Sequence, residues 1–576
     1  MLTKNIRRAL RASSTLLLLS LYGLPNIGRA DVPDAASNPA RNFDEAVTRA
    51  IQNENSLLQR MKKMRPVVET YIQKMRKDAD FGTVPTSDTY FLGQLDISRG
   101  VIQDSFIPAP GMPKRILHTL SGSKLFKLSF LPSGFATMIM MDPGDFDRQH
   151  YTFKYLRREF LGDVRCIVAD VVPQKNSGHG RFEGRIWIED EGYHVVRFNG
   201  TYKFPPMMQG YSHFDSWRVN SGPNLWLPMC TYVEESSQPY ALGARKAQFR
   251  AQTRLWGYQS KKDRSDDAFT NLTINVAQGV DDKSEAAAEN SPIESQRLWE
   301  RQAEDNVLDR LQEAGLVAPS GEVDKILQTV LQNLQVTNKI VVSPEIRARV
   351  LMTTPLESFT VGNTVVVSRG LIDVLPDEAS LAAILAHELA HIALGQKIDT
   401  KYSFADRLFF NDDESLKKVT MVRSAAEEEA ADKKAVDYLK NSPYSDKLAK
   451  VGLFLRALSA RSNDMPNLIR PLLGNRVAKS GEDMRLTPLL QMAPELHMDR
   501  TDEIEALPLG ARIKLDPWTD QLRLLKSRSV PLLSAKEKLP FEVTPFMLHL
   551  TRENSAPGPA PVAANQGGAP TQSATQ

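Results

Sequence analysis

LAAILAHELAHIALGQ, residues 381–396, places two histidines and a glutamate in a stretch that is otherwise almost entirely apolar. Pro376 and Asp377 ahead of it are helix-start signals, and Gly395 near its end is a stop signal. We therefore predict one helix of about four or five turns. Burying ionisable groups among Leu, Ala and Ile costs free energy unless these groups have a partner. We therefore expect the fold to provide partners for these three side chains.

The spacing of the three polar residues fits a metal site. On a helix, His387 and His391 lie one turn apart on the same face, where both rings can reach one ion. Glu388 is rotated by about 100° from His387, which places its carboxylate beside the ion. This HExxH arrangement supplies two zinc ligands and a general base for a zinc-bound water. We predict one Zn²⁺ per chain, the alternative being two histidines packed in an ordinary core.

A second predicted helix, residues 420–440, carries three consecutive glutamates and offers a third ligand. At about 100° per residue, Glu428 and Asp432 fall on one buried stripe, whereas Glu427 and Glu429 fall to either side. The other members of the stripe are Met421, Ala425, Ala435 and Leu439. A cation offsets the cost of burying Glu428, and Asp432 is placed to accept a hydrogen bond from a ligand histidine. The alternative, an acidic surface cluster, fits Glu427 and Glu429 better.

HELAH in an apolar helix, followed by E-x-x-A-D, resembles the gluzincin metallopeptidases. The similar families are HtpX, the CAAX prenyl proteases, the Oma-type proteases and the periplasmic BepA and LoiP type. The resemblance covers residues 295–465. It implies that His387, His391 and Glu428 bind zinc and that Glu388 is the catalytic base. It also implies that Asp432 orients a ligand from the second shell.

Residues 357–375, ESFTVGNTVVVSRGLIDVL, resemble the segment whose strand borders the cleft in that family. Here Glu357 and Ser358 stand where relatives carry Asn-Ala, and Asn363 replaces a glycine. These departures affect the expected contacts of the cleft wall, whereas the expected metal ligands are unaffected. An extended peptide pairs with an exposed strand edge, and we expect residues 365–367 to offer that edge.

A group that polarises the scissile carbonyl is also expected. Many relatives carry a histidine in a T-H-P segment ahead of an arginine. This chain lacks T-H-P but has His497 ahead of Arg512. We take His497 as the candidate transition-state stabiliser, with an isolated surface histidine as the alternative.

The ligand helices are joined by residues 396–424, which are too charged to span a membrane. Aromatic and leucine side chains in this segment could form a lid, touch a membrane surface, or pack against neighbouring helices. They are Phe404, Leu408, Phe409 and Phe410.

The predicted fold class is α+β multidomain. An N-terminal antiparallel β-rich domain precedes a mostly α-helical, zincin-like metallopeptidase domain. Residues 55–80 look helical. The β-rich texture is faintly similar to the half-barrels of outer-membrane lipoprotein carriers. The expected divisions are a signal peptide (1–30), an N-terminal helical segment (31–84), the β-rich domain (85–277), a linker (278–292), the zinc metallopeptidase domain (293–465), its C-terminal extension (466–553) and a disordered tail (554–576).

The first thirty residues read as a secretory signal, because basic residues precede the short apolar run SSTLLLLSLYGL. Cleavage after Ala30 predicts a periplasmic or secreted protein, and a retained anchor is the alternative. Removing the five basic residues of this segment leaves 67 Lys and Arg against 69 Asp and Glu. This balance gives no sign of nucleic-acid binding. In an exported protein, Cys166 and Cys230 form either one disulfide or two buried free thiols.

The leading hypothesis is an exported zinc metalloendopeptidase that cuts misfolded or envelope proteins, with Glu388 as the base for a zinc-activated water. The preference for such protein substrates follows from family analogy alone. In the alternative, the β-rich domain binds a protein or lipid partner in a chaperone-like or lipid-carrier-like role. The zinc domain is then regulatory or weakly active. Glu388 discriminates between them, because a binding protein needs no general base.

Overall fold

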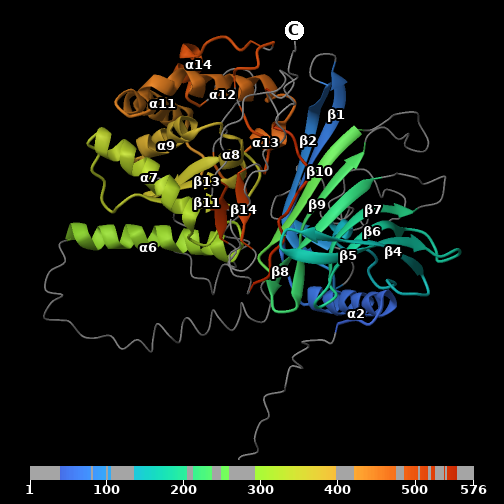
Figure 1. Ribbon diagram of the computed structural model, residues 1–576. Coiled ribbons are helices and arrows are strands. Elements are labelled where there is room, and N and C mark those ends of the chain that lie inside the picture. Colours follow the sequence, from blue (N-terminus) through green and yellow to red (C-terminus); the bar gives the residue numbers. More distant parts are fainter. Residues whose placement is uncertain are drawn as a thin grey trace, which may run out of the picture.

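The computed structural model of this 576-residue chain shows a large β-sheet with a mostly helical domain beside it (Figure 1). The large sheet is antiparallel, so the predicted α+β multidomain fold class is confirmed. The residues that the structure describes are 39–78, 82–98, 102–105, 135–203, 212–235, 248–258, 292–396, 421–474, 485–497, 499–503, 506–510, 512–516, 521–525, 538 and 541–553.

Ten described strands form one antiparallel sheet in the order β3-β2-β1-β10-β9-β8-β7-β6-β5-β4. From β4 to β10 each strand pairs with the next along the chain, and β1 then pairs with β10. The strands are β1 (Val67–Asp78), β2 (Gly82–Asp96), β3 (Ile102–Ser105), β4 (Tyr151–Leu161), β5 (Val164–Pro173), β6 (Arg181–Glu189), β7 (Val195–Lys203), β8 (His213–Gly222), β9 (Leu225–Glu235) and β10 (Gln248–Trp256).

The prediction of a helix through residues 55–80 is wrong beyond Met61. Helix α2 (Phe43–Met61) ends there, and β1 begins directly after Pro66, a residue that disfavours helix. Residues 67–73 are all buried because β1 is covered on both faces. A strand buried on both faces shows no alternation of apolar and polar residues, so its pattern resembles that of a helix.

The two faces of the large sheet are covered differently. One face packs against α2 and residues 135–146, which contain the short helix η2 (Thr137–Ile139). Phenylalanines of the sheet pack there edge to face, as in the pair Phe182–Phe198 with ring centroids 5.7 Å apart. The opposite face carries the helical domain near β1, β2 and β10, and residues 541–553 extend this cover toward β4 and β5.

Buried polar contacts join the sheet to the helical domain. Glu69 of β1 accepts hydrogen bonds from the Thr354 amide at 2.6 Å and from Arg369 Nη2 at 3.1 Å. Gln73 of β1 donates to the Phe541 carbonyl at 2.7 Å. We expected residues 466–553 to be a C-terminal extension of the peptidase domain. Residues 541–553 also contact the large sheet, where side chains of the sheet pair with their backbone.

The helical domain is built around a three-stranded sheet of order β11-β13-β12. β13 is the central strand, parallel to β11 and antiparallel to β12. The prediction that residues 365–367 offer a free edge is therefore wrong, and β12 is an edge strand. The elements are α6 (Pro292–Glu313), α7 (Glu322–Thr337), β11 (Arg347–Leu351), β12 (Ser358–Val361), β13 (Thr364–Ser368), α8 (Arg369–Val374), α9 (Glu378–Ala393), α11 (Ala425–Lys440), η5 (Ser445–Lys447), α12 (Leu448–Arg461), α13 (Pro466–Ile469), α14 (Thr487–Met492), β14 (Ile513–Leu515) and β15 (Leu522–Leu524).

The two cysteines are buried free thiols. Cys166 lies on β5 and Cys230 on β9, with β6, β7 and β8 between them. Neighbouring strands are about 4.8 Å apart, so the two positions are separated by far more than the roughly 4.4–6.8 Å between Cα atoms that a disulfide requires. The alternative of a disulfide is therefore excluded by the sheet order.

Several predicted segments lie outside the described residues: the signal peptide at 1–30, the linker up to residue 291, the tail at 554–576 and the four apolar residues of the segment between the ligand helices. Within the described residues, no helix is both long and apolar enough to cross a membrane.

Candidate metal centre

Helix α9 carries the two histidines, and its predicted limits are confirmed. The Asp377 side chain caps the N-terminus by accepting a hydrogen bond from the Ser380 amide at 2.8 Å. Gly395 follows the last turn with φ +67°, a conformation that favours glycine. From Ala379 to His391 every residue of α9 is buried. A helix buried on all sides holds its polar side chains in fixed positions, which suits a ligand set.

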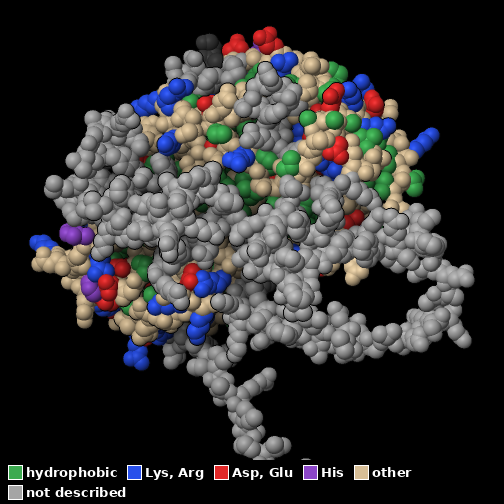
Figure 2. Space-filling model, turned by 180° about the vertical axis from the view of Figure 1, so that it is seen from behind, with side chains coloured by type: hydrophobic (Ala, Val, Ile, Leu, Met, Phe, Trp, Pro, Cys, Tyr) green, Lys and Arg blue, Asp and Glu red, His purple; other side chains and the backbone are tan. Residues whose placement is uncertain are grey.

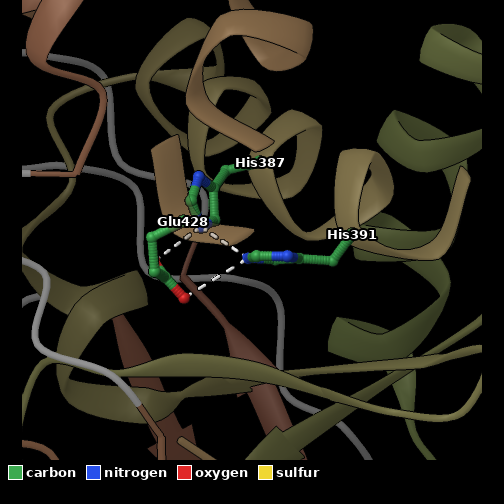
Figure 3. Close-up of side chains that lie close together, drawn as sticks. All are labelled: His387, His391 and Glu428. Carbon is green, nitrogen blue, oxygen red and sulfur yellow. Dashed lines mark hydrogen bonds and ion pairs between the residues drawn. The ribbon is translucent and has the colours of Figure 1, made fainter. Parts of the chain in front are cut away.

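Glu428 of α11 meets the two histidines of α9 (Figure 3). The Nε2 atoms of His387 and His391 lie 3.0 Å apart. Glu428 Oε2 is 3.2 Å from His387 Nε2, and its Oε1 is 3.4 Å from His391 Nε2. One potential ligand atom from each residue lies within 4.8 Å of the others, so the structure brings together the three residues that the sequence singled out.

The local sequence of α11 explains why Glu428 faces inward. The helix begins at Ala425 and not at 420, because Ser424 and Glu427 form a capping box there. Glu427 is thus a capping residue, and the Glu429 side chain is 69% exposed and pairs with Lys433. The Glu428 side chain is 16% exposed and points to the histidines. The separation of the three glutamates by helical rotation agrees with the structure.

The outer ring nitrogens of both histidines contact oxygen acceptors. His387 Nδ1 lies 2.8 Å from Asp432 Oδ1, and His391 Nδ1 lies 2.6 Å from Gln396 Oε1. These oxygens favour a proton on each Nδ1. Each Nε2 then carries a lone pair, and the two lone pairs face each other and the Glu428 carboxylate. A cation between them relieves this repulsion. Two imidazoles and a carboxylate are also a ligand set that Zn²⁺ prefers, so the residues fit the predicted metal.

The Glu428 carboxylate is held in its ionised form. Burial by itself would raise its pKa, but Arg485 and the two histidines together hold the pKa far below its usual value. For His387, burial and Arg485 would lower the pKa, and the neighbouring Asp432 and Glu428 outweigh them and raise it.

The Glu388 side chain is completely buried beside the three residues. Its Oε1 accepts hydrogen bonds from Ser358 Oγ at 2.7 Å and Arg485 Nη1 at 3.0 Å. Its Oε2 is buried and has no hydrogen-bond partner within the described part of the chain. Burial by itself would raise the pKa of Glu388, but Arg485, the two histidines and the hydrogen bond from Ser358 together outweigh burial and lower it. Glu388 is therefore an ionised carboxylate with one oxygen held by two donors and a second, buried oxygen without a partner among the described residues.

Sequence reasoning missed Arg485, a buried arginine just before α14. Its Nε donates to Glu428 Oε2 at 2.9 Å, so the guanidinium bridges Glu428 and Glu388. The stretch around it, EDMRLTP (482–488), mixes acidic and basic residues without periodicity. No local signal marks Arg485, and only the tertiary structure reveals it. Gln396 was also missed, although it lies only five residues after His391.

His497 lies elsewhere. Its side chain is exposed, and its backbone carbonyl accepts a hydrogen bond from Lys538. Among the described residues no contact joins its ring to the three clustered residues, and the cationic group beside Glu388 is Arg485. The role predicted for His497 stays a prediction without structural support.

Residues 319–405 match the model of Peptidase family M48. The match spans the small sheet, α9 and its two histidines, and it ends before Glu428. This similarity supports an M48 metallopeptidase domain in this part of the chain. A comparison with curated proteins found no match.

Two of the solved structures that match cover just over a third of this chain and nearly all of their own chains. A DUF1329 family protein from Desulfovibrio piger is 11% identical, with a TM-score of 0.20, over 37% of this chain and 93% of that chain. A putative outer membrane lipoprotein-sorting protein domain from Vibrio parahaemolyticus is 9% identical, with a TM-score of 0.19, over 38% of this chain and 98% of that chain. These low scores give no support to a particular role for the large sheet.

Proposed function

We propose that this chain is a zinc metalloendopeptidase. His387, His391 and Glu428 would hold the metal, Asp432 would orient His387, and Glu388 would be the general base. The observation that carries the proposal is the pair of Nε2 atoms 3.0 Å apart, directed at an ionised carboxylate. A bound zinc supplies a Lewis acid that polarises the peptide carbonyl and acidifies water.

The residues of the chain then have separate tasks. Glu388 Oε2, which has no partner within the described residues, accepts a proton from the attacking water and later delivers it to the leaving amine. Arg485 helps to keep Glu388 ionised, and its guanidinium would stabilise the negative charge that develops on the carbonyl oxygen. This assigns to Arg485 the electrophilic role that the sequence suggested for His497.

We propose extended protein or peptide segments as substrates, and β12 as the strand that they meet. β12 lies at the edge of its sheet, and its Ser358 contacts Glu388 directly. A substrate strand beside β12 would lie next to the clustered residues. On the face shown in Figure 2, basic and acidic side chains are interspersed among the described residues. This surface is unlike the single-signed stripe that binds nucleic acid.

The signal-like sequence of residues 1–30 supports the proposal of an exported enzyme that acts on misfolded or envelope proteins.

The test is Glu388→Gln, which keeps the shape of the side chain and removes the base. We expect this variant to keep about one zinc per chain and to lose cleavage of a dye-labelled unfolded protein such as casein by at least about 100-fold. Glu429→Gln is the matched control, because the Glu429 side chain is 69% exposed and pairs with Lys433 away from the clustered residues, so the rate should stay unchanged. Equal cleavage by wild type and Glu388→Gln would refute the assigned base.

A further inference from the structure

Ser358 touches the proposed base from the edge strand. It is the first residue of β12, and its side chain is completely buried. Because strand residues alternate in direction, Ser358 points to α9 while Glu357 points away, where its carboxylate accepts the amide of Leu473 at 3.0 Å. The strand therefore holds the Ser358 hydroxyl against Glu388 through its backbone register, with little freedom left to the side chain.

The direction of the Ser358 hydrogen is fixed by Arg485. Arg485 Nη1 lies 3.0 Å from Ser358 Oγ and can only donate. The hydroxyl oxygen accepts that bond, which leaves its own hydrogen for Glu388 Oε1 at 2.7 Å. Arg485 and Ser358 thus both bind Oε1, and neither binds Oε2.

The difference between the two oxygens of Glu388 matters because the energy profile of the terminal torsion of a glutamate is broad and roughly two-fold. Without an anchor, the Glu388 carboxylate would rotate and exchange its two oxygens. Two donors on Oε1 hold the carboxylate plane, and Oε2 becomes the oxygen that can meet the attacking water. A substrate strand paired with β12, as proposed above, would pass this same residue, so Ser358 would align both the base and the substrate strand.

We propose that Ser358 is a positioning residue for catalysis, which holds Glu388 so that Oε2 exchanges protons. This inference rests on the proposed peptidase function. Ser358 does not itself take or give a proton in the reaction, and its contribution is geometric. A misplacement of a catalytic group by about 1 Å can cost about 100-fold in rate, so removing the hydroxyl should mainly lower kcat.

The experiment compares Ser358→Ala, Ser358→Thr and Ser358→Cys with wild type in the zinc-loaded full chain. The substrate is a quenched fluorescent peptide taken from a casein digest. For Ser358→Ala we expect kcat to fall by about 10- to 100-fold, with KM and zinc content unchanged. Threonine keeps the hydroxyl and suits a strand, so Ser358→Thr should restore most of kcat. The weaker donor in Ser358→Cys should give an intermediate kcat.

Thr364→Val is the matched control. It removes another buried hydroxyl from the same small sheet, one that contacts Arg347, and kcat should stay within about twofold of wild type. Ser358→Ala or Ser358→Cys with wild-type kcat, while Glu388→Gln is inactive, would overturn the positioning role alone. A fall in kcat that follows a loss of zinc or of folded protein in all three variants would also overturn it. A wild-type protein that cuts no substrate would instead refute the proposed function.

Discussion

Replacing Asp432 by asparagine should weaken zinc binding while it preserves the shape of the site. Asp432 Oδ1 lies 2.8 Å from His387 Nδ1, and its side chain is only 10% exposed, so water screens this contact little. The carboxylate fixes the ring so that Nε2 faces the metal, and its negative charge makes Nε2 a stronger ligand. Asparagine keeps an acceptor oxygen and loses the charge.

The expected magnitude follows from this geometry. Loss of such an outer partner costs about 10- to 100-fold in metal affinity, which corresponds to about 1.4–2.7 kcal/mol. Asp432→Asn should lie near the lower limit because a hydrogen-bond acceptor remains. Asp432→Ala should lie near the upper limit, because it leaves the buried Nδ1 proton without an acceptor.

Competition with a chromophoric zinc chelator would measure the dissociation constant directly. Asp437→Asn provides the control, because Asp437 is an exposed carboxylate on the same helix and changes the net charge equally. Equal zinc affinity in wild type and Asp432→Ala would show that the contact with His387 does not support a metal ligand, and the reasoning for this site would fail.

Three further predictions concern other parts of the chain. Glu428→Ala should lower zinc content well below one per chain, whereas Glu429→Ala, which alters an exposed neighbour, should not; atomic absorption on the pure proteins decides. Glu69→Ala should destabilise the protein by about 3–5 kcal/mol in urea unfolding, because it leaves Arg369 buried without this partner. A loss smaller than about 1 kcal/mol would contradict a rigid junction between the sheet and the helical domain. Burial raises the pKa of Glu357 to about 7, although the amides of residues 472–474 and Arg485 oppose the shift. The protonated carboxyl therefore favours folding, and this contribution is present below about pH 4.5 and is lost as the pH rises through 7. Relative to Glu357→Gln, the free energy of unfolding of the wild type should fall by up to about 3 kcal/mol between pH 4.5 and 8. Parallel curves of this free energy against pH for the two proteins would contradict the raised pKa of Glu357.

The clustering of His387, His391 and Glu428 could be predicted from the sequence because helical rotation is a local property. The spacing of His387 and His391 fixes their common face, and the same rotation separates Glu428 from Glu427 and Glu429. Start and stop residues set the limits of α9, since capping depends on side chains within a few positions of the helix end. The β-rich texture likewise predicted an antiparallel sheet, because turn residues between short strands are a local signal.

Contacts between distant segments decided the rest. Arg485 reaches Glu388 across 97 residues of sequence, and no periodicity connects the two positions. The order of the small sheet makes β12 the edge and β13 the centre, although both strands carry apolar residues. Packing on both faces removed the alternation of β1 and made it look helical. Sequence patterns show on which face of its own helix or strand a side chain lies. Which residue that side chain contacts depends on how the helices and strands pack together.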